Sequence, residues 1–446
     1  MTETGRPDAE KLEPERSAKS LILRGSVLTV AGYGFGQLVR LISNIVLARL
    51  LFPEAFGLMT LVNIFLQGLQ LFSDMGLSVS IIQNPRGSET GFLRTVWTLE
   101  ILRGVVLVTG GVILAWPTAS AYGEPSLIAY IQVSTLALAI ASLKSTNIQL
   151  STRRVVLGRV VLIEVASQLA ASVGMILLAW KFRSVWALVA GGLIASAVHA
   201  LLSHLVLEGP RMALRFDRKI VREVLHFGKW IFLSTALTFG VNCLDRVALG
   251  KLMTLGELGV YSIAAALVFM IVQLGTKLSS TVLIPVYSRL LESEDLEEKR
   301  AQLFRIRSLY CAAMLVPVFA LMLMGQFVVD LLYDDRYSEA GWMLEYLIIG
   351  AGFGIISQTL APVMLASGNS RRHLVYMTSR FVFLATLMLI LGWHFGVVGV
   401  IWASVLTPLL SYPVLVYLLR NENLSHPKLE IPLLLLVGVV GALSVT

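Results

Sequence analysis

The chain has 446 residues, of which 56% are hydrophobic and 14% are charged, and its formal net charge is +8. Soluble globular domains are about 45–50% apolar and about 25% charged, so this composition excludes a water-soluble fold and indicates an integral membrane protein. The apolar runs are long and rich in Leu, Gly and Ala, which excludes a transmembrane barrel of strands that alternate over about ten residues.

The predicted elements begin with a polar tail, residues 1–20, whose charges and scarce apolar side chains predict disorder. An N-lobe of six membrane helices follows at residues 21–207, because apolar runs near or above about 18 residues can cross a bilayer. The first run carries Arg40 and Asn44 and lacks a small-residue cleavage pattern, so we expect a retained helix and not a signal peptide. The six helices are predicted at Gly25–Leu47, Leu58–Leu77, Val96–Trp116, Leu127–Leu143, Val160–Trp180 and Val185–Leu207.

Residues 208–229 form the most basic connection of the chain and join two sets of helices. Apolar residues at helical spacing, such as Ile220 and Val224, predict a basic amphipathic helix that lies on the cytoplasmic membrane surface. A C-lobe at residues 230–419 follows. Residues 420–446 supply a polar loop and an apolar stretch of about 24 Å, which forms either a short thirteenth span or part of a helix. The C-lobe helices are predicted at Trp230–Leu252, Val260–Ile284, Tyr310–Leu332, Leu344–Leu365, Leu374–His394 and Val397–Leu419.

One motif occurs twice, and each copy joins two apolar stretches. Leu47–Leu51 is followed by Gly57–Leu61, and Leu249–Met253 is followed at the same spacing by Gly259–Ile263. Internal repeats are typical of transporters, so this repeated motif predicts two pseudo-symmetric six-helix lobes that move around a shared cavity. The expected fold class is an all-α membrane protein with twelve transmembrane helices and a candidate thirteenth. The expected function is transport of a substrate.

Basic side chains gather in alternate connections, whereas the connections between them carry few. Because positively charged connections stay in the cytoplasm, the N-terminus and the basic linker are predicted there. This asymmetry also accounts for most of the net positive charge. It therefore removes the reason to expect a nucleic-acid partner.

The motif belongs to a longer series of segments whose order and spacing are specific. The series includes LARLLFPEAFG at Leu47–Gly57, SDMGLSVSIIQ at Ser73–Gln83 and DRVALGKLMTLGELGVYSIA at Asp245–Ala264. Together the segments resemble the polysaccharide-transporter (oligosaccharide or O-antigen flippase) family of the multidrug/oligosaccharidyl-lipid/polysaccharide exporter superfamily. The resemblance implies a multi-pass protein of the bacterial inner membrane that flips an undecaprenyl-diphosphate-linked oligosaccharide to the outer leaflet by alternating access. We also expect a polysaccharide polymerase and other assembly proteins as partners.

Charged side chains inside the predicted helices are the main clue to a binding site. A charge at the centre of a membrane helix costs at least about 2.5–3.5 kcal/mol, so such groups usually face a cavity or a partner. A diphosphate needs cationic partners, and arginine can bind one with two parallel hydrogen bonds. Arg40 and the pair Asn242 and Arg246 occupy nearly equivalent repeat positions, which predicts opposite walls of one cavity. The candidate substrate-binding residues are Arg40, Asn44, Asn242, Arg246, Lys277, Arg103 and Arg380.

Other roles are open for some of these residues. Arg103 and Arg380 could snorkel to the cytoplasmic surface, and Lys277 could form an ion pair across helices. Among the acidic residues, Asp245 and Glu164 are the candidates for binding a coupling proton or sodium ion, although each could instead pair with an arginine or cap a helix. No cofactor or metal site is predicted, since the two cysteines lie in separate apolar stretches.

Three other functions fit parts of this pattern. A multidrug or toxin extruder of the same fold would favour an acidic or aromatic cavity for organic cations, whereas many of the intramembrane charges here are basic. A lipid II-type flippase shares the fold and a diphosphate substrate, and the sequence separates it poorly from an oligosaccharide flippase. A membrane glycosyltransferase or ligase would need catalytic groups in a large outer connection, and every predicted outer connection is short. We therefore expect a transporter and not an enzyme.

Overall fold

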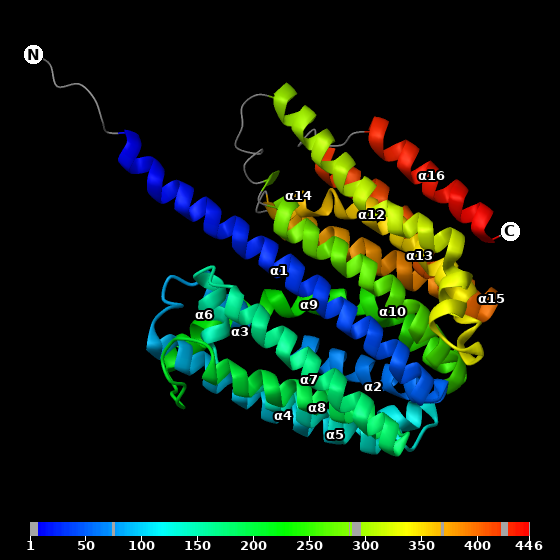
Figure 1. Cartoon of the computed structure of the whole chain (residues 1–446), viewed down its shortest axis with the longest axis horizontal. Coiled ribbons are helices and arrows are strands. Elements are labelled where there is room, and N and C mark those ends of the chain that lie inside the picture. The colour runs from blue at the N-terminus through cyan, green and yellow to red at the C-terminus, as the bar shows by residue number, and fades with distance from the viewer. Residues whose placement is uncertain are drawn as a thin grey trace, which may run out of the picture.

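The structure is a computed structural model that describes residues 8–73, 76–284, 286–287, 296–366, 370–420 and 427–445. Throughout these residues the regular structure is helical, and the helices form two lobes side by side (Figure 1). The helices of the N-lobe are α1 (Asp8–Leu50), α2 (Pro53–Phe72), α3 (Leu77–Gln83), α4 (Thr90–Tyr122), α5 (Leu127–Ser142), α6 (Asn147–Arg153), α7 (Gly158–Phe182) and α8 (Trp186–Leu205).

Two spans of the C-lobe are interrupted near an end. Its helices are α9 (Arg218–Leu252), α10 (Leu255–Leu278), the π-helical η1 (Ser279–Leu283), α12 (Leu296–Leu332), the 3-10 helix η2 (Asp335–Tyr337), α13 (Ala340–Gln358), α14 (Ala361–Ala366), α15 (Ser370–Leu419) and α16 (Pro427–Val445).

Helix α15 contains two of the predicted spans, because Gly396 interrupts its helical geometry with φ +58° and ψ −130°. Glycine alone adopts this conformation readily. In the described part of the chain, eight helices are long and apolar enough to cross a membrane, or nine if the bent pair α5 and α6 is one span. With α15 divided in two, and with the more polar α2 and α9, the core has the twelve predicted helices, and α16 is a shorter apolar helix that follows them.

The first helix is longer than predicted. Residues 8–20, for which we predict disorder, are helical, because α1 runs from Asp8 to Leu50. The sequence AEKLE directly after Asp8 consists of strong helix formers, and extending a helix costs little once it is nucleated. The helix α1 therefore begins inside the stretch for which we predict disorder, and residues 1–7 lie outside the described part.

The last part of the linker is the first part of a longer helix, α9. The Asp217 side chain caps α9 by accepting hydrogen bonds from the backbone N–H groups of Lys219 and Ile220 at 2.9 and 3.4 Å, and the helix continues to Leu252. Ile220 and Val224 are buried in a cluster with apolar side chains of α3, α4 and α6. Two of the apolar side chains that we expect on lipid, Ile220 and Val224, are therefore covered by the N-lobe, which removes them from water.

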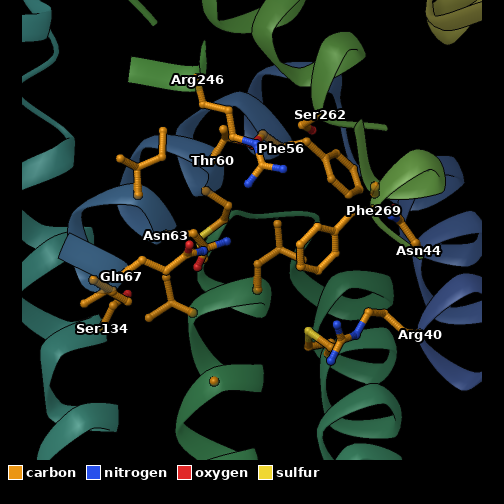
Figure 2. A pocket seen from close by; sticks show the side chains of 18 of the residues that line it. Arg40, Asn44, Phe56, Thr60, Asn63, Gln67, Ser134, Arg246, Ser262 and Phe269 are labelled. Carbon is orange, nitrogen blue, oxygen red and sulfur yellow. The ribbon is translucent and has the colours of Figure 1, made fainter. Parts of the chain in front are cut away.

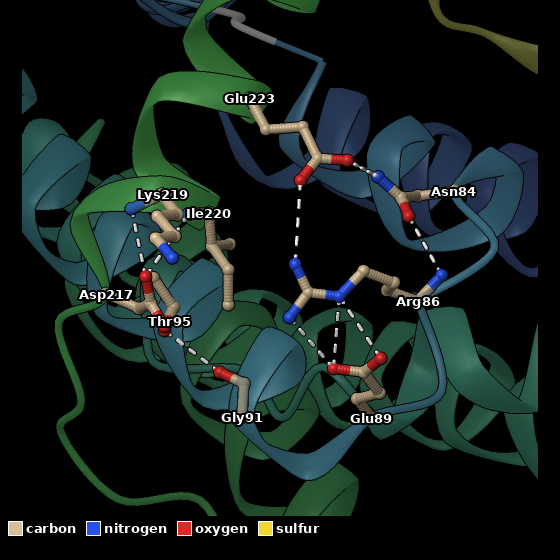
Figure 3. Close-up of polar contacts among 9 residues, drawn as sticks. All are labelled: Asn84, Arg86, Glu89, Gly91, Thr95, Asp217, Lys219, Ile220 and Glu223. Atoms are coloured by element: carbon tan, nitrogen blue, oxygen red, sulfur yellow. Dashed lines mark hydrogen bonds and ion pairs between the residues drawn. The ribbon is translucent and has the colours of Figure 1, made fainter.

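Polar contacts fasten the start of α9 to the turn between α3 and α4 (Figure 3). Glu223 accepts a hydrogen bond from the Asn84 amide, and its carboxylate lies 3.9 Å from the Arg86 guanidinium. Arg86 also pairs with Glu89 at 3.1 Å. One helix of 35 residues thus begins on the N-lobe and ends in the C-lobe.

The two ends of the molecule are held differently. We call the end at which α1, α4 and α9 begin the basic end, and the end that holds the two copies of the repeated motif the motif end (Figure 1). At the motif end, a Cβ atom at Gly57 would overlap the carbonyl oxygen of Leu255, and one at Gly259 would overlap that of Pro53. Each copy therefore places its glycine against the backbone of the other, a close approach that needs glycine.

A side chain of the C-lobe also holds the end of α1. Arg336 in η2 donates hydrogen bonds to the carbonyl oxygens of Ala48 and Leu51 at 3.0 and 3.2 Å. Its guanidinium carbon lies 5.6 Å from the ring centre of Phe52. The last carbonyl groups of a helix lack partners within the helix and carry partial negative charge. An arginine there supplies hydrogen-bond donors to them and balances the charge. The motif end is thus closed by contacts between the lobes.

At the basic end of the C-lobe, a buried arginine joins three elements. Arg307 of α12 pairs with Glu430 of α16 at 2.7 Å, and its guanidinium donates to the Thr359 hydroxyl at 3.1 and 3.2 Å, at the break between α13 and α14. Tyr287 donates to the Thr359 carbonyl oxygen at 2.6 Å. The side chains of Arg307 and Glu430 are 2% and 4% exposed. Helix α16 is therefore attached to the core through a buried charge as well as through apolar packing.

Candidate functional site

A cavity of about 470 Å³ lies between the lobes. Helix α1 contributes Arg40 and Asn44 to its wall, and α9 contributes Arg246 (Figure 2). The structure therefore brings three of the predicted candidates together, with one arginine from each lobe. Apolar side chains form much of the remaining lining of this central cavity, and its other polar residues are Gln37, Thr60, Asn63, Gln67, Ser134 and Ser262.

Two polar atoms on this wall have no hydrogen-bond partner in the described part of the protein. They are Oδ1 of Asn44 and the hydroxyl oxygen of Ser134, and both are buried. An unpaired buried polar group costs about 1–3 kcal/mol, so such groups are normally hydrogen-bonded. The described lining contains two arginines and no carboxylate. The central cavity is therefore equipped to bind a polar, anionic ligand.

A second chamber of about 530 Å³ adjoins the central cavity toward the basic end. Gln37 and Arg40 line both spaces, so Arg40 stands at their boundary. Lys277 and Glu164 line the second chamber. The Lys277 ammonium lies 5.9 Å from the ring centre of Tyr33, within range of a cation–π attraction. Among the described residues, Lys277 is thus near an aromatic ring and has no carboxylate within ion-pair distance.

Arg103 lies in a third, smaller pocket of about 220 Å³ at the basic end. It pairs with Glu100 at 3.3 Å and donates to the Ser73 hydroxyl and the Gln70 carbonyl oxygen at 3.0 and 2.9 Å. These bonds cap the end of α2, whose last carbonyl groups lack partners within the helix. Arg103 therefore has a structural task here, and only part of its side chain is available to a ligand.

Two predicted candidates lie outside these three cavities. Asn242 is exposed, one helical turn closer to the basic end than Arg246. The guanidinium carbon of Arg380 lies 5.9 Å from the ring centre of Tyr376. Neither Asn242 nor Arg380 belongs to the lining of the central cavity, the second chamber or the third pocket.

Of the two acidic candidates, Asp245 points into the C-lobe. Its carboxylate accepts a hydrogen bond from the hydroxyl of the buried Tyr261 at 2.7 Å. Neighbouring residues are about 100° apart around a helix, so Asp245 turns away from the cavity that Arg246 faces. The structure thus brings five candidates into two adjoining chambers: Arg40, Asn44, Arg246, Lys277 and Glu164.

Sequence reasoning missed two features of the site. Asn63 and Gln67 both line the central cavity. They are four residues apart in α2, and a polar pair at this spacing in an apolar run could have revealed them. Lys144 lines both the second chamber and the third pocket. Lys144 follows a predicted span, so the sequence favours placing it in a cytoplasmic connection. The break between α5 and α6 cannot be recognised from the apolar run alone.

Two six-helix lobes around a polar cavity define an all-helical membrane transporter. The structure of the lipid II flippase MurJ in an inward closed conformation shares this fold, with a TM-score of 0.71 and 14% sequence identity, covering 94% of this chain and 98% of that chain. The model of the polysaccharide biosynthesis protein family matches residues 46–341, more than half of the chain. The chain therefore belongs to this family, the polysaccharide transporters of the multidrug/oligosaccharidyl-lipid/polysaccharide exporter superfamily, which confirms the prediction.

Two individual relatives extend the match along the chain. The lipopolysaccharide biosynthesis protein WzxC of Escherichia coli K12 is 22% identical over 399 residues, which covers 88% of this chain and 79% of WzxC. The succinoglycan biosynthesis transport protein ExoT of Rhizobium meliloti is 22% identical over 347 residues, which covers 77% of this chain and 68% of ExoT. The match to WzxC is long enough to include both lobes.

Proposed function

We propose that the protein moves an undecaprenyl-diphosphate-linked oligosaccharide, such as an O-antigen or exopolysaccharide repeat unit, from the cytoplasmic to the outer leaflet of the bacterial inner membrane. The polyprenyl tail stays in lipid while the diphosphate and the glycan cross through the chambers as the lobes alternate. The observation that carries this proposal is the placement of Arg40 and Arg246, one from each lobe, around a cavity whose described lining has no carboxylate. The names of WzxC and ExoT, both proteins of polysaccharide biosynthesis, support the glycan class.

The basic end lies in the cytoplasm in this proposal, as the positive-inside rule favours. The closed motif end then faces outward, and the second chamber lies on the cytoplasmic side of the central cavity. A substrate made in the cytoplasm would meet Lys277 and Arg40 before Arg246. The polymerase and other assembly proteins would act on the glycan after it reaches the outer leaflet.

The charged groups of the cavity also bear on the alternative functions. An extruder of organic cations would need acidic groups, and two arginines without a carboxylate repel such a substrate. A lipid II-type flippase remains the close alternative, because its substrate carries the same diphosphate and MurJ shares the fold. Transport, and not an enzymatic reaction, is what the relatives and the cavity support.

Glu164 is the better candidate for a coupling proton or sodium ion. Its carboxylate lines the second chamber together with Arg40 and Lys277, so its charge state can influence the groups that hold the substrate. Asp245 is less suited, because it is hydrogen-bonded to Tyr261 inside the C-lobe.

Transport by variants that lack a cavity arginine tests the proposal. Arg40→Gln and Arg246→Gln should abolish polymer production in a strain without its own flippase, and should stop flipping of a fluorescent undecaprenyl-diphosphate oligosaccharide in proteoliposomes. Arg49→Gln is the matched control and should transport normally, because Arg49 is exposed at the motif end. Normal transport by both cavity variants would overturn the assignment. Transport of an organic cation in place of the diphosphate lipid would favour the extruder.

A further inference from the structure

The three cavities form a series, and a cation stands at each boundary. The central cavity and the second chamber share Gln37 and Arg40 as lining residues. The second chamber and the third pocket share Ala141 and Lys144. A ligand that passes from the basic end to the central cavity would therefore meet Lys144 first and Arg40 afterwards.

The backbone around Lys144 is held rigidly at the break between α5 and α6, where the two helices are bent by 57°. The carbonyl oxygen of Leu143 pairs with Nε2 of His204 at 2.8 Å and accepts a hydrogen bond from Nε1 of Trp97 at 3.3 Å. The N–H group of Ser145 donates to the Ser203 hydroxyl at 2.9 Å. Broken helices are tolerated at membrane depth when neighbours satisfy the freed backbone groups in this way. The contacts fix the base from which the Lys144 side chain reaches the two spaces.

The Lys144 side chain is partly buried and has charges of both signs around it. The charged groups that act on it are Glu100, Arg103 and Glu164. Glu100 is paired with Arg103, and no carboxylate in the described part of the chain lies within ion-pair distance of Lys144. A cation inside a membrane protein without a paired carboxylate is costly, which is why such groups mark substrate and ion pathways.

The choice of lysine at this boundary also suits a passing ligand. An ammonium group carries three rotatable donors on a flexible stem, whereas an arginine presents a fixed planar fork. A lysine can therefore stay in contact with a phosphate group that moves from one space to the next, and can release it to the more rigid arginine. The neighbouring Arg103 is less suited to this part, because most of its donors are engaged with Glu100 and the end of α2.

We propose that Lys144 binds the diphosphate of the lipid-linked substrate near the basic end, before Arg40 receives it at the edge of the central cavity. This inference rests on the proposed function and adds a step to it. Lys144 sets how well the substrate is captured, while the arginines are required for the passage itself.

Initial rates in phosphatidylcholine proteoliposomes test this step, with a fluorescent undecaprenyl-diphosphate oligosaccharide as the probe. Loss of one charged hydrogen bond in Lys144→Gln should raise the half-saturating substrate concentration about tenfold, with little change in the maximal rate. Lys144→Arg should stay close to wild type. Lys181→Gln is the matched control and should be unaffected, because Lys181 is exposed at the motif end, 5.3 Å from the ring centre of Phe182.

Chemical restoration of the charge separates capture from a structural role. Lys144→Cys should show the same rise in half-saturating concentration, aminoethyl methanethiosulfonate should reverse it, and the neutral methyl reagent should not. Both native cysteines are buried, which limits side reactions. Wild-type saturation in Lys144→Gln, together with failure of Arg40→Gln, would overturn this inference and leave the proposed function standing. A lower maximal rate without a shift in half-saturation would also overturn it. Absence of transport by the wild type would instead count against the proposed function itself.

Discussion

Arg103 and Arg307 occupy comparable places in the two lobes and have different surroundings. Each lies on the third spanning helix of its lobe, and each hydrogen-bonds the chain where a neighbouring helix stops. The side chains of the pair Arg103–Glu100 are 22% and 19% exposed and border the third pocket, whereas those of Arg307–Glu430 are 2% and 4% exposed beneath α16. The added helix α16 thus makes Arg307 a purely structural group. Arg103, which no added helix covers, keeps a polar pocket beside it.

The largest effect is expected from Arg307→Met. This substitution removes the ion pair that Arg307 makes with the buried Glu430, and breaking a buried pair on one side costs about 3–5 kcal/mol. The free energy of unfolding of the purified protein in detergent, followed by tryptophan fluorescence, should fall by that amount. A loss below about 1 kcal/mol would mean that α16 does not seal this site as the structure shows.

The double variant Arg307→Met with Glu430→Leu should recover most of this loss. Replacing both members of a buried pair with apolar residues of similar size is often neutral or stabilising. The free energy of unfolding should return to within about 1–2 kcal/mol of the wild type, which a double-mutant cycle would measure as coupling between the two sites. Additive losses in the cycle would contradict a direct interaction.

A smaller loss, about 1–2 kcal/mol, is expected from Arg103→Gln. The ion pair with Glu100 is partly exposed and contributes at most about 1 kcal/mol, and the bonds to the end of α2 contribute the rest. Amide hydrogen exchange should accelerate in the last turn of α2 and stay unchanged in α13. Equal losses for Arg103→Gln and Arg307→Met would remove the distinction between the two lobes.

The spans themselves were predictable, because long apolar runs allow one main interpretation in a membrane protein. The breaks were not, because each depends on tertiary partners: Trp97 and His204 satisfy the carbonyl group of Leu143, and Arg103 satisfies that of Gln70. The pair Arg307–Glu430 joins residues 123 positions apart, which no local pattern reveals.

The candidate site was predictable where the repeat gave equivalent positions on two helices. Arg40 and Arg246 meet around one cavity, as expected from their places in the two copies. Asn242 and Arg380 shared the same polar character but do not line it, because membership of an apolar run does not say which way a side chain faces. Lys144 was missed for the related reason that its helix is broken.

The smallest effect is expected from the Asp217 cap at the start of α9, the helix that packs over the N-lobe. The backbone hydrogen bond from Lys219 lowers the pKa of the Asp217 carboxyl below its ordinary value of 3.8. Because the folded-state pKa is the lower one, the stabilisation is present above the ordinary value and is lost as the pH falls through the folded value. Amide exchange in the first turn of α9 should therefore be slower in the wild type than in Asp217→Ala at neutral pH. At low pH the two proteins should exchange at similar rates. Asp217→Asn keeps the cap without the titration, so its difference from Asp217→Ala should not change with pH.

The reciprocal contact of Gly57 with Leu255 and of Gly259 with Pro53 links the evolution of the two halves of the chain. A larger residue in one copy would need the backbone of the other copy to retreat, so neither half can change alone at this point. In a dimer of single lobes the same contact would be isologous, with each subunit offering the same glycine to the same turn of its mate. In the fused chain the symmetric contact is made by backbone atoms, so it is preserved even where the side chains of the two halves have diverged.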